Sequence, residues 1–593
     1  VTTIGGDDMR KITELLTEAA AQAFEKCGYD PKLATVAVSD RQDLCQFQCN
    51  GAFAGAKLYK KAPFVIAEEA ARVLSLDERF ARVEAVKPGF INITLKDEFL
   101  VDYVNGIAKD ENLGVPQAEN PETIVIDYGG PNVAKPLHIG HLRSAIIGEA
   151  VKRIARATGR TVYGDVHFGD WGTPLGLVIA EYRERHPDWA CFKEDFDPAV
   201  DTVPDIDEDE LNEIYPFASA KSKQDEAFRD TARQVTTELQ SHKPGIYDLW
   251  KKIMEVSVGS VKKNYSKLDV SFDLWYGESD ADPYIPETID ILTKKGLLHE
   301  SDGAMVVDVQ EDGDKITIPP IIVTKSNKSV GYDTTDLATI VQRQRDFKPS
   351  RIWYVVDKRQ SLHFTQVFRC AKKAGFVPED TELKLLGFGT MNGSDGKPFK
   401  TRDGGVMRLS DLIQTAIDGA MEKLEDSDYI SDNKLETAEK IGMAAIKFGD
   451  LSNQPSKDYI FDLNKFLAFD GKTGTYLLYT VTRINSILAK ADINPAATPV
   501  IKAIHTDTER ELALDIALSG EVYQKAFDEM APCVLCDNAY NIAAVFSRFY
   551  HDNRILSEED EAKRTDWLNM AALARRVIVK HLDMLAIDTV EHM

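Results

Sequence analysis

The feature that most restricts the fold is a strand, a turn, a long helix and a second strand that follow one another directly. The apolar run Thr123–Tyr128 ends at Gly129-Gly130-Pro131, and a helical pattern then extends from Leu137 to Ala157. A second strand pattern, Arg160–Tyr163, comes immediately after Gly159. This order is typical of an open parallel sheet, in which ligands bind at the carboxyl ends of the strands. We therefore predict an α/β fold with a Rossmann-type catalytic core.

Other patterns divide the chain into further units. Residues 9–113 combine an amphipathic helix pattern at Arg10–Cys27 with alternation at Pro88–Leu95, which predicts an N-terminal α+β domain. We assign residues 119–449 to the parallel-sheet core, with an insertion at about 186–300. Residues 450–593 have a helical pattern and are expected to form an all-α bundle.

The individual segments behind this division are as follows. Further strand patterns in the core are Gly303–Asp308, Arg351–Val356 and Leu383–Phe388. The clearest helical patterns in the bundle are Tyr476–Ala489, Thr508–Met530, Val534–Phe549 and Trp567–Met584. The acidic run Asp201–Glu210 is interpreted as a solvated face of the insertion.

Composition excludes several classes of protein. The chain has 593 residues, 43% of them hydrophobic, and a net charge of −25, so disorder and non-specific coating of DNA or anionic membranes are not expected. We find no apolar run long enough to span a bilayer, and seven scattered cysteines fit a reducing, cytoplasmic setting. Residues 1–8, ahead of Met9, are interpreted as an added remnant or an extended start and carry no functional argument.

The strongest local signal is PNVAKPLHIGHLRS, Pro131–Ser144, in the first strand-to-helix turn. His138 and His141 lack a third ligand at matching spacing, so no bound metal is expected. A helix N-terminus with imidazole donors suits nucleotide phosphates, and Gly140 leaves room for an adenine or ribose. We therefore predict an ATP site here, although the four residues His138–His141 would also fit a small nucleotidyltransferase.

A second signal is the glycine-rich, basic loop Gly393–Arg402, which follows the strand pattern at Leu383–Phe388. Lys397 and Lys400, three residues apart, can neutralise a polyphosphate while its charge redistributes. The position of this loop after a strand of the same sheet favours a catalytic loop over a solvated basic turn.

Together these strings resemble the class I aminoacyl-tRNA synthetases, and specifically the arginyl-tRNA synthetases of bacterial type. His138–His141 is similar to the first signature of the class, and Lys397–Thr401 to a divergent second signature that keeps only the lysine spacing and the hydroxyl residue. The resemblance extends from Met9 to Met593. It also rests on His167–Gly176 (HFGDWGTPLG), Tyr332–Asp336 (YDTTD), Asp357–Gln360 (DKRQ) and Phe469–Leu488 (FDGKTGTYLLYTVTRINSIL).

The resemblance implies a ligase that joins L-arginine to tRNA(Arg). Selecting a planar guanidinium requires carboxylates and a flat stacking partner. By resemblance, Asp336 and Tyr332 meet the guanidinium and Asp127 lies at the same pocket. Asn132, His138 and Gln360 hold the polar end of arginine. The ATP-binding set implied is His138, Gly140, His141, His363 and Lys400, with His138, His141, Lys397 and Lys400 as the catalytic residues.

The implied reaction is attack of the arginine carboxylate on the α-phosphorus of ATP, followed by transfer to the terminal ribose of the tRNA. A carboxylate is already a nucleophile, so alignment and charge neutralisation suffice. We expect Mg²⁺ to accompany ATP as a co-substrate and no metal to be bound tightly by the protein. The resemblance also implies that tRNA must be bound before arginine is activated.

Contacts with tRNA are expected from both terminal units. Tyr476, Tyr479, Arg483 and Asn485 offer groups that stack on and pair with unstacked bases, in what resembles an anticodon-binding domain. In the N-terminal unit the candidate patch is Lys57, Lys60 and Lys61. Cys533 and Cys536 have the spacing of half a zinc site, but with no second pair they are interpreted as packing residues.

Two functions of other classes remain open at this stage. A stand-alone nucleotidyltransferase would use the histidine turn but would leave the N-terminal unit and the helical section unexplained. An inactive RNA-binding paralogue would have lost the site residues, whereas His138, His141, Lys400, Asp127 and Asp336 all stand. We expect a monomer with tRNA, arginine and ATP as partners, and neither DNA nor membrane.

Overall fold

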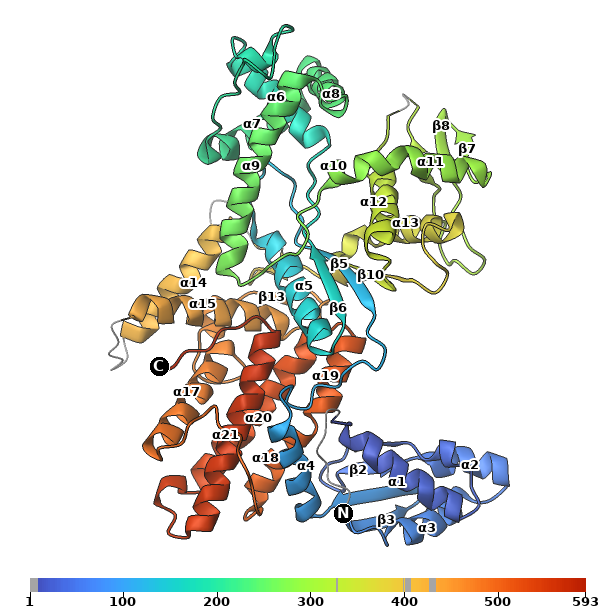
Figure 1. Ribbon diagram of the computed structural model, residues 1–593, viewed down its shortest axis with the longest axis vertical. Helices are drawn as coiled ribbons and strands as arrows, with labels where there is room; N and C mark the ends of the chain where they lie inside the picture. Colours follow the sequence, from blue (N-terminus) through green and yellow to red (C-terminus); the bar gives the residue numbers. More distant parts are fainter. Residues whose placement is uncertain (1–8, 327–328, 398, 400–406, 426–432) are drawn as a thin grey trace.

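A four-stranded parallel sheet lies near the centre of the structure, which is a computed structural model that describes residues 9–326, 329–397, 399, 407–425 and 433–593 (Figure 1). The strand order is β11-β10-β5-β6. Ile126 on β5 lies opposite Trp353 on β10, and both side chains are buried, as expected for strands covered on both faces. The bounds are β5 (Thr123–Tyr128), β6 (Thr161–Asp165), β10 (Arg351–Asp357) and β11 (Glu382–Phe388).

Helix α5 (Ile139–Ala157) follows β5 and is tied to the sheet by Ser144. The hydroxyl of Ser144 accepts from the backbone N–H of Gly129 at 2.8 Å and donates to the carbonyl of Val355 at 2.6 Å. One side chain therefore links α5 to the ends of β5 and β10. The other elements of the core are α6 (Thr173–Arg185), α12 (Tyr332–Phe347), α13 (Ser361–Ala374) and β12 (Met391–Asn392).

Two groups of elements are inserted between β6 and α12. The first is helical and projects from the sheet at the top of Figure 1, with α7 (Glu208–Gln224), α8 (Glu226–Gln240) and α9 (Pro244–Lys267). The second contains α10 (Glu278–Ala281), α11 (Ile285–Lys294), β7 (His299–Ser301), β8 (Ala304–Val307) and β9 (Ile321–Thr324). The strand expected at Gly303–Asp308 is present as β8, but it belongs to a separate antiparallel sheet, β7-β8-β9.

The N-terminal unit is an antiparallel sheet of order β1-β2-β4-β3 packed with helices, which agrees with the α+β prediction. Arg510 of α18 (Asp507–Ala517) pairs with Asp97 at 2.6 Å and so joins the N-terminal unit to the C-terminal helical unit. The elements of the N-terminal unit are α1 (Ile12–Lys26), β1 (Val36–Val38), β2 (Phe47–Cys49), α2 (Gly51–Tyr59), α3 (Pro63–Leu74), β3 (Phe80–Val86), β4 (Phe90–Leu95) and α4 (Asp97–Lys109).

The C-terminal unit is helical, as expected. The helix expected at Thr508–Met530 is two helices that separate at Leu518, because Ser519-Gly520 is a weak helix-forming pair. The boundary expected at residue 450 lies in the last turn of α15. The bounds are α14 (Leu409–Glu425), α15 (Lys434–Leu451), β13 (Tyr459–Ile460), α16 (Leu463–Phe466), α17 (Gly474–Lys490), α18 (Asp507–Ala517), α19 (Ser519–Asp528), α20 (Pro532–Asp552) and α21 (Glu561–Met584).

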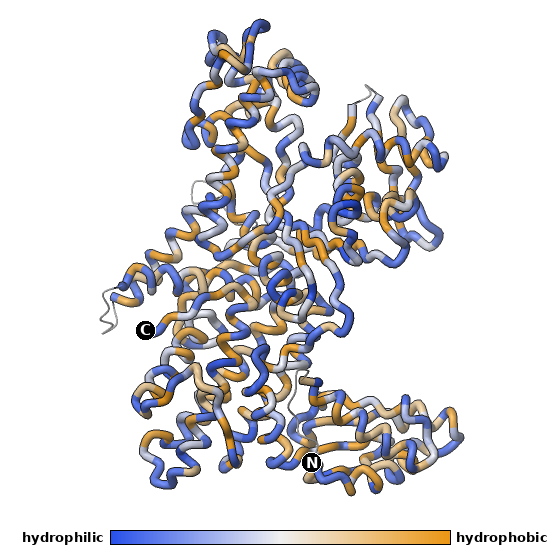
Figure 2. The backbone as a smooth tube through the Cα atoms, viewed as in Figure 1, coloured by the Kyte–Doolittle hydropathy of each residue, from blue (hydrophilic) through white to orange (hydrophobic). Residues whose placement is uncertain are grey.

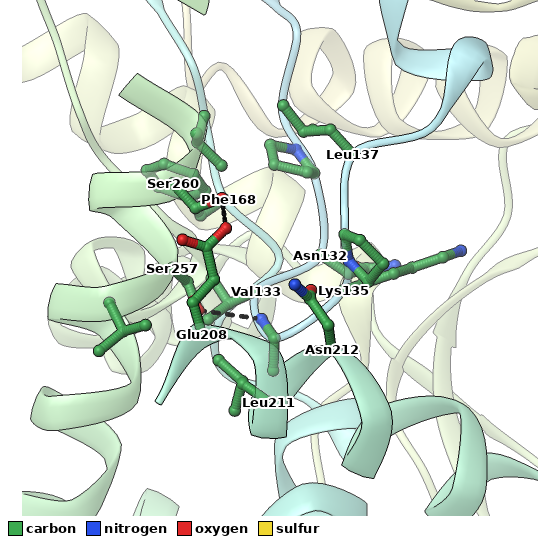
Figure 3. A pocket seen from close by; sticks show the side chains of 15 residues that line it. Asn132, Val133, Lys135, Leu137, Phe168, Glu208, Leu211, Asn212, Ser257 and Ser260 are labelled. Carbon is green, nitrogen blue, oxygen red and sulfur yellow. Dashed lines mark hydrogen bonds between the residues drawn. The ribbon is translucent and has the colours of Figure 1, made fainter. Parts of the chain in front are cut away.

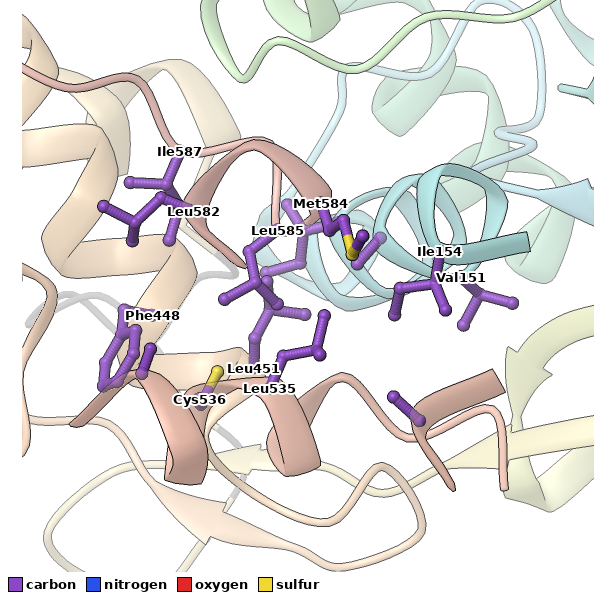
Figure 4. Packing of buried hydrophobic residues seen from close by; sticks show 14 of the residues in the cluster. Val151, Ile154, Phe448, Leu451, Leu535, Cys536, Leu582, Met584, Leu585 and Ile587 are labelled. Carbon is purple, nitrogen blue, oxygen red and sulfur yellow. The ribbon is translucent and has the colours of Figure 1, made fainter. Parts of the chain in front are cut away.

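The helical unit shares a continuous core with the parallel sheet. Figure 4 shows Val151 and Ile154 of α5 facing Leu451, Leu535 and Met584 from three other helices, and all five are buried. Figure 2 shows hydrophobic and hydrophilic residues alternating along these helices, the pattern of helices that bury one face. Cys533 and Cys536 are buried in α20, in agreement with their interpretation as packing residues. Across the described ranges, no helix has both the length and the hydrophobicity needed to cross a bilayer.

Close packing of α5 on β5 generates a stability prediction. A Cβ added at Gly148 would lie 2.2 Å from Cγ of Tyr128, a ring whose hydroxyl lies within hydrogen-bonding distance of two acceptors, Glu149 and the carbonyl of Ser271. We expect Gly148→Ala to destabilise the fold by about 2 kcal/mol, because overpacking outweighs the gain of about 1 kcal/mol in helix propensity. The urea midpoint measures this effect. The matched control is Gly259→Ala in α9, where no atom lies within 4 Å of the new Cβ and the midpoint should not fall. Equal midpoints for the two variants would contradict the prediction.

Candidate active site

The two histidines of the first signature cap helix α5. Nδ1 of His138 accepts from the backbone N–H of Gly140, and Nδ1 of His141 accepts from the backbone N–H of His138, both at 3.0 Å. The two rings lie 4.0 Å apart between centroids. Because each Nδ1 is an acceptor, we infer that the proton of each neutral ring is on Nε2. The turn therefore presents two N–H donors, one from the Nε2 of each ring.

Both histidines are neutral near pH 7. Burial, and then the charge of Lys135, lowers the pKa of His138 to about 4. Burial, followed by the neighbouring His138, lowers the pKa of His141 to about 3. A Cβ at Gly140 would lie 2.8 Å from the His138 ring, so glycine also lets this cap close. With the positive end of the α5 dipole behind it, the turn can bind an anion.

The loop that carries the second signature begins after strand β12, and the chain that follows it returns to the histidine turn. Its entry strand β12 pairs in parallel with β13, Met391 opposite Tyr459. Its exit pairs with the histidine turn itself: the N–H of Ile139 donates to Met407, and the N–H of Leu409 donates to Leu137, both at 3.0 Å. The segment that follows the second signature therefore lies beside the first signature, although the two are far apart in the sequence.

The two loop lysines differ in what the structure describes. The side chain of Lys397 is exposed, and its backbone N–H donates to Asp395 at 3.0 Å. Lys400 lies outside the described residues, so its role stays a prediction.

A buried arginine fixes the junction between these segments. Arg143, in α5, pairs with Asp450 of α15 at 3.0 Å and donates to the carbonyl of Gly389, just before β12, at 2.6 Å. Tyr459 of β13 donates to the same Asp450 at 2.7 Å. The helix that carries the histidines, the strands at the loop entry and the helical unit are thus held by one network.

A second buried arginine holds α12 against the carboxyl ends of β5 and β6. Nη2 of Arg343 lies 2.6 Å from Asp127 and 2.6 Å from Asp165, and its side chain is 1% exposed. Burial raises the pKa of Asp127 despite the nearby guanidinium, whereas the pKa of Asp165 is lowered to about 2 because Arg343 and His167 outweigh burial. One oxygen of Asp127 is therefore already committed to an internal guanidinium.

Two of the residues predicted for the arginine side chain, Tyr332 and Asp336, lie at the start of α12, whereas Asp127 lies in β5. Asp336 is half-buried, whereas Tyr332 is 65% exposed, so its ring is open to a ligand. Nε2 of His363, from the first turn of α13, lies 2.5 Å from Asp336, and its ring centroid is 5.0 Å from that of Tyr332. The structure thus brings His363 to Asp336 and Tyr332, although the sequence assigned it to ATP.

Gln360 and Asn132 follow two neighbouring strands, β10 and β5, at the carboxyl edge of the sheet. Gln360 precedes α13 and is exposed, directly after the end of β10. Asn132 follows β5 and bridges to Gly169, where an added Cβ would lie 2.3 Å from Oδ1 of Asn132. Gly169, in the HFGDWG string, is therefore needed for the asparagine side chain to lie flat on the neighbouring loop.

Sequence reasoning missed Glu278, the first residue of α10. Its carboxylate accepts from the backbone N–H of Trp171. Burial raises its pKa to about 7 against the opposing charge of His167, and Asp336 and Asp170 add to the rise. The structure shows no cation paired with it among the described residues. Since Tyr276-Gly277-Glu278 belongs to no recognisable motif, only the fold could bring this carboxylate to the site.

His167 is a second residue whose setting the sequence did not predict. Nδ1 of His167 lies 3.7 Å from the carboxylate of Asp165. Burial opposes a charge on the ring, but the carboxylates of Asp165 and Asp127 raise the pKa of His167 to about 9. Asp127, Asp165 and His167 form the one group within the described ranges that could hold a metal ion. Arg343 already pairs with both carboxylates, so this group does not fit a resident cation.

A small pocket lies behind the histidine turn, between the turn and the inserted helices α7 and α9. Figure 3 shows Asn132, Lys135 and Leu137 on one side and Glu208, Ser257 and Ser260 on the other. The hydroxyl of Ser257 accepts from the N–H of Ala134 at 3.3 Å. The insertion thus supports the turn from the side opposite the sheet.

The residues predicted to contact tRNA differ in how free they are. Tyr479 is exposed, while Tyr476 bonds to Ser547 at 2.9 Å and Arg483 lies over the ring of Tyr550. Asn485 accepts from Arg575. In the N-terminal unit Lys57, Lys60 and Lys61 are all exposed, and Lys61 pairs with Glu69 at 3.2 Å.

Three family models match successive parts of the chain. They are described as "Arginyl tRNA synthetase N terminal domain" over residues 10–95, "tRNA synthetases class I (R), catalytic domain" over 103–463, and "DALR anticodon binding domain" over 477–593.

Similar proteins cover the whole chain. The arginine–tRNA ligase of Agathobacter rectalis is 47% identical and that of Alkaliphilus oremlandii 48% identical, each match covering 99% of this chain and 100% of the relative. The solved arginyl-tRNA synthetases of Thermus thermophilus and Plasmodium falciparum superpose with a TM-score of 0.80 each, covering 98% and 99% of this chain and all of theirs. At 23% identity these two structures support the fold alone.

The buried pairing of Arg343 generates a second stability prediction. We expect Arg343→Met to cost about 3–5 kcal/mol at pH 7, because Asp127 and Asp165 would be left buried without a cation. The loss of unfolding free energy relative to wild type should be smaller at pH 5, because carboxylates without the guanidinium take up protons more readily.

Urea unfolding at the two pH values measures both effects. The control is Arg345→Met on the same helix, whose side chain is 55% exposed and pairs with Glu287, so a change of about 0.5 kcal/mol or less is expected. An Arg343→Met variant as stable as this control would contradict the prediction.

Proposed function

The chain belongs to the arginyl-tRNA synthetases, ligases of class I, and we propose how its residues divide the work of joining L-arginine to tRNA(Arg). In this family reaction ATP activates arginine as the adenylate, AMP leaves when arginine is transferred to the 3′-terminal ribose, and pyrophosphate is the other product. The proposal concerns the roles of individual residues at the carboxyl edge of the sheet.

His138 and His141 bind the phosphates of ATP in this proposal. Their two Nε2–H groups donate to phosphate oxygens, and Gly140 lets the nucleoside approach the helix N-terminus. Lys400, with Lys397, neutralises charge as the pyrophosphate departs. The backbone bonds of Met407 and Leu409 to Leu137–Ile139 support this role, because they bring the chain that follows the loop beside the histidine turn.

Asp336 and Glu278 receive the guanidinium of arginine, with Tyr332 stacking beside it. A planar cation placed between two half-buried carboxylates satisfies both, and no salt bridge among the described residues occupies Glu278, whose pKa burial raises. Asp127 borders the same pocket, but its bond to Arg343 gives it mainly an orienting part. Asn132, His138 and Gln360 hold the amino acid's polar end, so its carboxylate points toward the α-phosphorus.

Activation then needs no general base. The arginine carboxylate attacks phosphorus directly, and the chain's contribution is to align the reactants and to neutralise charge. The described residues around the histidine turn do not fit a resident metal, so we propose that Mg²⁺ arrives with the triphosphate and is held mainly by substrate oxygens.

Binding of tRNA is proposed for both terminal units. Tyr479, with Tyr476, Arg483 and Asn485 on the same helix α17, contacts anticodon bases, and Lys57, Lys60 and Lys61 contact the tRNA backbone. We further propose that the chain acts as a monomer in the cytoplasm, where its seven unpaired cysteines would stay reduced. The division into residues 9–113, 119–449 and 450–593 stays a working proposal.

The observation that carries the proposal is the convergence of three features at one edge of the sheet: the capped histidine turn, the ends of the lysine loop and the acidic first turn of α12. Amino-acid-dependent ATP–pyrophosphate exchange tests it. We expect exchange with arginine alone among the twenty amino acids, and only when tRNA is present. Exchange with another amino acid, or none with arginine and tRNA, would overturn the proposal.

Asp336→Asn tests the guanidinium pocket. We expect kcat/KM for arginine to fall by about 30-fold to 1000-fold, since removing one charge of a buried pair costs about 2–4 kcal/mol. The KM for ATP should change less than twofold. Asp346→Asn, a substitution at the other end of α12, serves as the control and should leave both constants unchanged. An arginine kcat/KM within twofold of wild type would reject Asp336 as a ligand.

A further inference from the structure

His363 makes two contacts with carboxylates that together define its charge. Its Nδ1 lies 3.0 Å from Oδ1 of Asp333, and its Nε2 lies 2.5 Å from Oδ2 of Asp336. A carboxylate only accepts, so both ring nitrogens must donate, which a histidine can do only as the imidazolium. The three side chains are each between 17% and 21% exposed, so solvent screens these contacts only in part.

The surroundings favour the same protonation state. Burial alone would lower the pKa of His363, but the hydrogen bonds to Asp333 and Asp336 outweigh it and raise the pKa to about 9. Tyr332 and Phe364 flank the ring, each 5.0 Å away between centroids. The groups near Asp336 are acidic Glu278 and the hydroxyl of Tyr354.

We propose that His363 is a positioning residue for arginine, which as an imidazolium holds Asp336 in the orientation that receives the guanidinium. The proposal rests on the proposed function, since Asp336 is the ligand that it positions. Oδ2 of Asp336 is taken by the ring, and Oδ1 is left to accept from the substrate. Both nitrogens of His363 are committed to carboxylates, so none is left for a phosphate of ATP, the role that the resemblance implied.

Charge balance explains why a cation is needed at this point. Asp333 and Asp336 stand one helical turn apart and repel each other, and a carboxylate in such a pair tends to take up a proton. With His363 charged, the three groups carry one net negative charge, which a guanidinium neutralises. His363 also links the first turn of α13, next to Gln360, to the first turn of α12, so the two proposed halves of the arginine site keep a fixed spacing.

The opposite role is also testable, because the two roles predict changes of opposite sign. If the ring were instead a placeholder that arginine must displace, its removal would tighten arginine binding. Under the positioning role, His363→Ala should raise the arginine KM by about tenfold, with the ATP KM within twofold of wild type. His363→Gln, which keeps one N–H donor without the charge, should give a smaller rise. A fall in arginine KM, an unchanged KM, or a rise confined to the ATP KM would each overturn the proposal.

The pH profile separates positioning from a merely structural role. The imidazolium persists below its pKa, so its help should be complete near pH 7 and lost as the pH rises through about 9. Asp333→Asn removes one of the two stabilising carboxylates, so the rise in arginine KM should begin at lower pH. The ratio of the KM of His363→Gln to that of wild type cancels titration of arginine itself and should fall toward one at high pH. A constant ratio across the range would contradict the proposal.

Failure of this inference can be told apart from failure of the proposed function. If Asp336→Asn leaves the arginine constants unchanged, the proposed pocket itself is wrong. If Asp336→Asn weakens arginine use while both His363 variants behave as wild type, the pocket stands and only the role of His363 falls. Thermal unfolding of each variant shows whether the fold is intact, and His363→Gln provides the test if His363→Ala does not fold.

Discussion

The active site depends on a buried guanidinium that belongs to the protein itself. Arg343 reaches from α12 to the carboxyl ends of β5 and β6, where it pairs with Asp127 and Asp165. Because charges out of water must be matched closely, this contact leaves α12 little freedom to slide along the sheet. The first turn of the same helix carries Tyr332, Asp333 and Asp336, so an internal arginine sets the position of the groups proposed to bind the substrate arginine.

A second buried arginine connects chemistry to the rest of the molecule. Arg143 lies in the helix that begins with the signature histidines, and it bonds to the entry of the lysine loop and to Asp450 of the helical unit. The shared hydrophobic core in Figure 4 makes this a packed junction rather than a hinge between independent bodies. A structural change in the helical unit on binding tRNA would therefore be transmitted to the histidine turn through rigid contacts.

The sequence predicted those parts of the fold that have a local cause. The β5-α5-β6 unit follows from hydrophobic periodicity and the Gly129-Gly130-Pro131 turn, and α5 begins within two residues of the start expected at Leu137. The separate sheet of β8 and the break at Leu518 were not predicted, because a strand's partners and a helix's packing depend on distant segments.

The sequence does not indicate those contacts of the site that depend on pairing at long range. The partners of Arg343 are Asp127 and Asp165, 216 and 178 residues away, and no local pattern indicates them. Glu278 has no motif, and the contact of His363 with Asp336 emerges only when α12 and α13 are placed side by side. The family resemblance compensates for this by naming residues, but it does not say which atoms of each are free.

In the proposed site, one edge of the sheet holds arginine and ATP together, with the guanidinium at Asp336. The most direct measurement is a crystal structure of the chain with arginine, tRNA and a non-hydrolysable ATP analogue. The account predicts a guanidinium nitrogen about 2.7–3.2 Å from Oδ1 of Asp336, with His363 still on Oδ2 and phosphate oxygens at Nε2 of His138 and His141. Arginine bound away from Asp336, or phosphates bound away from the two histidines, would contradict it.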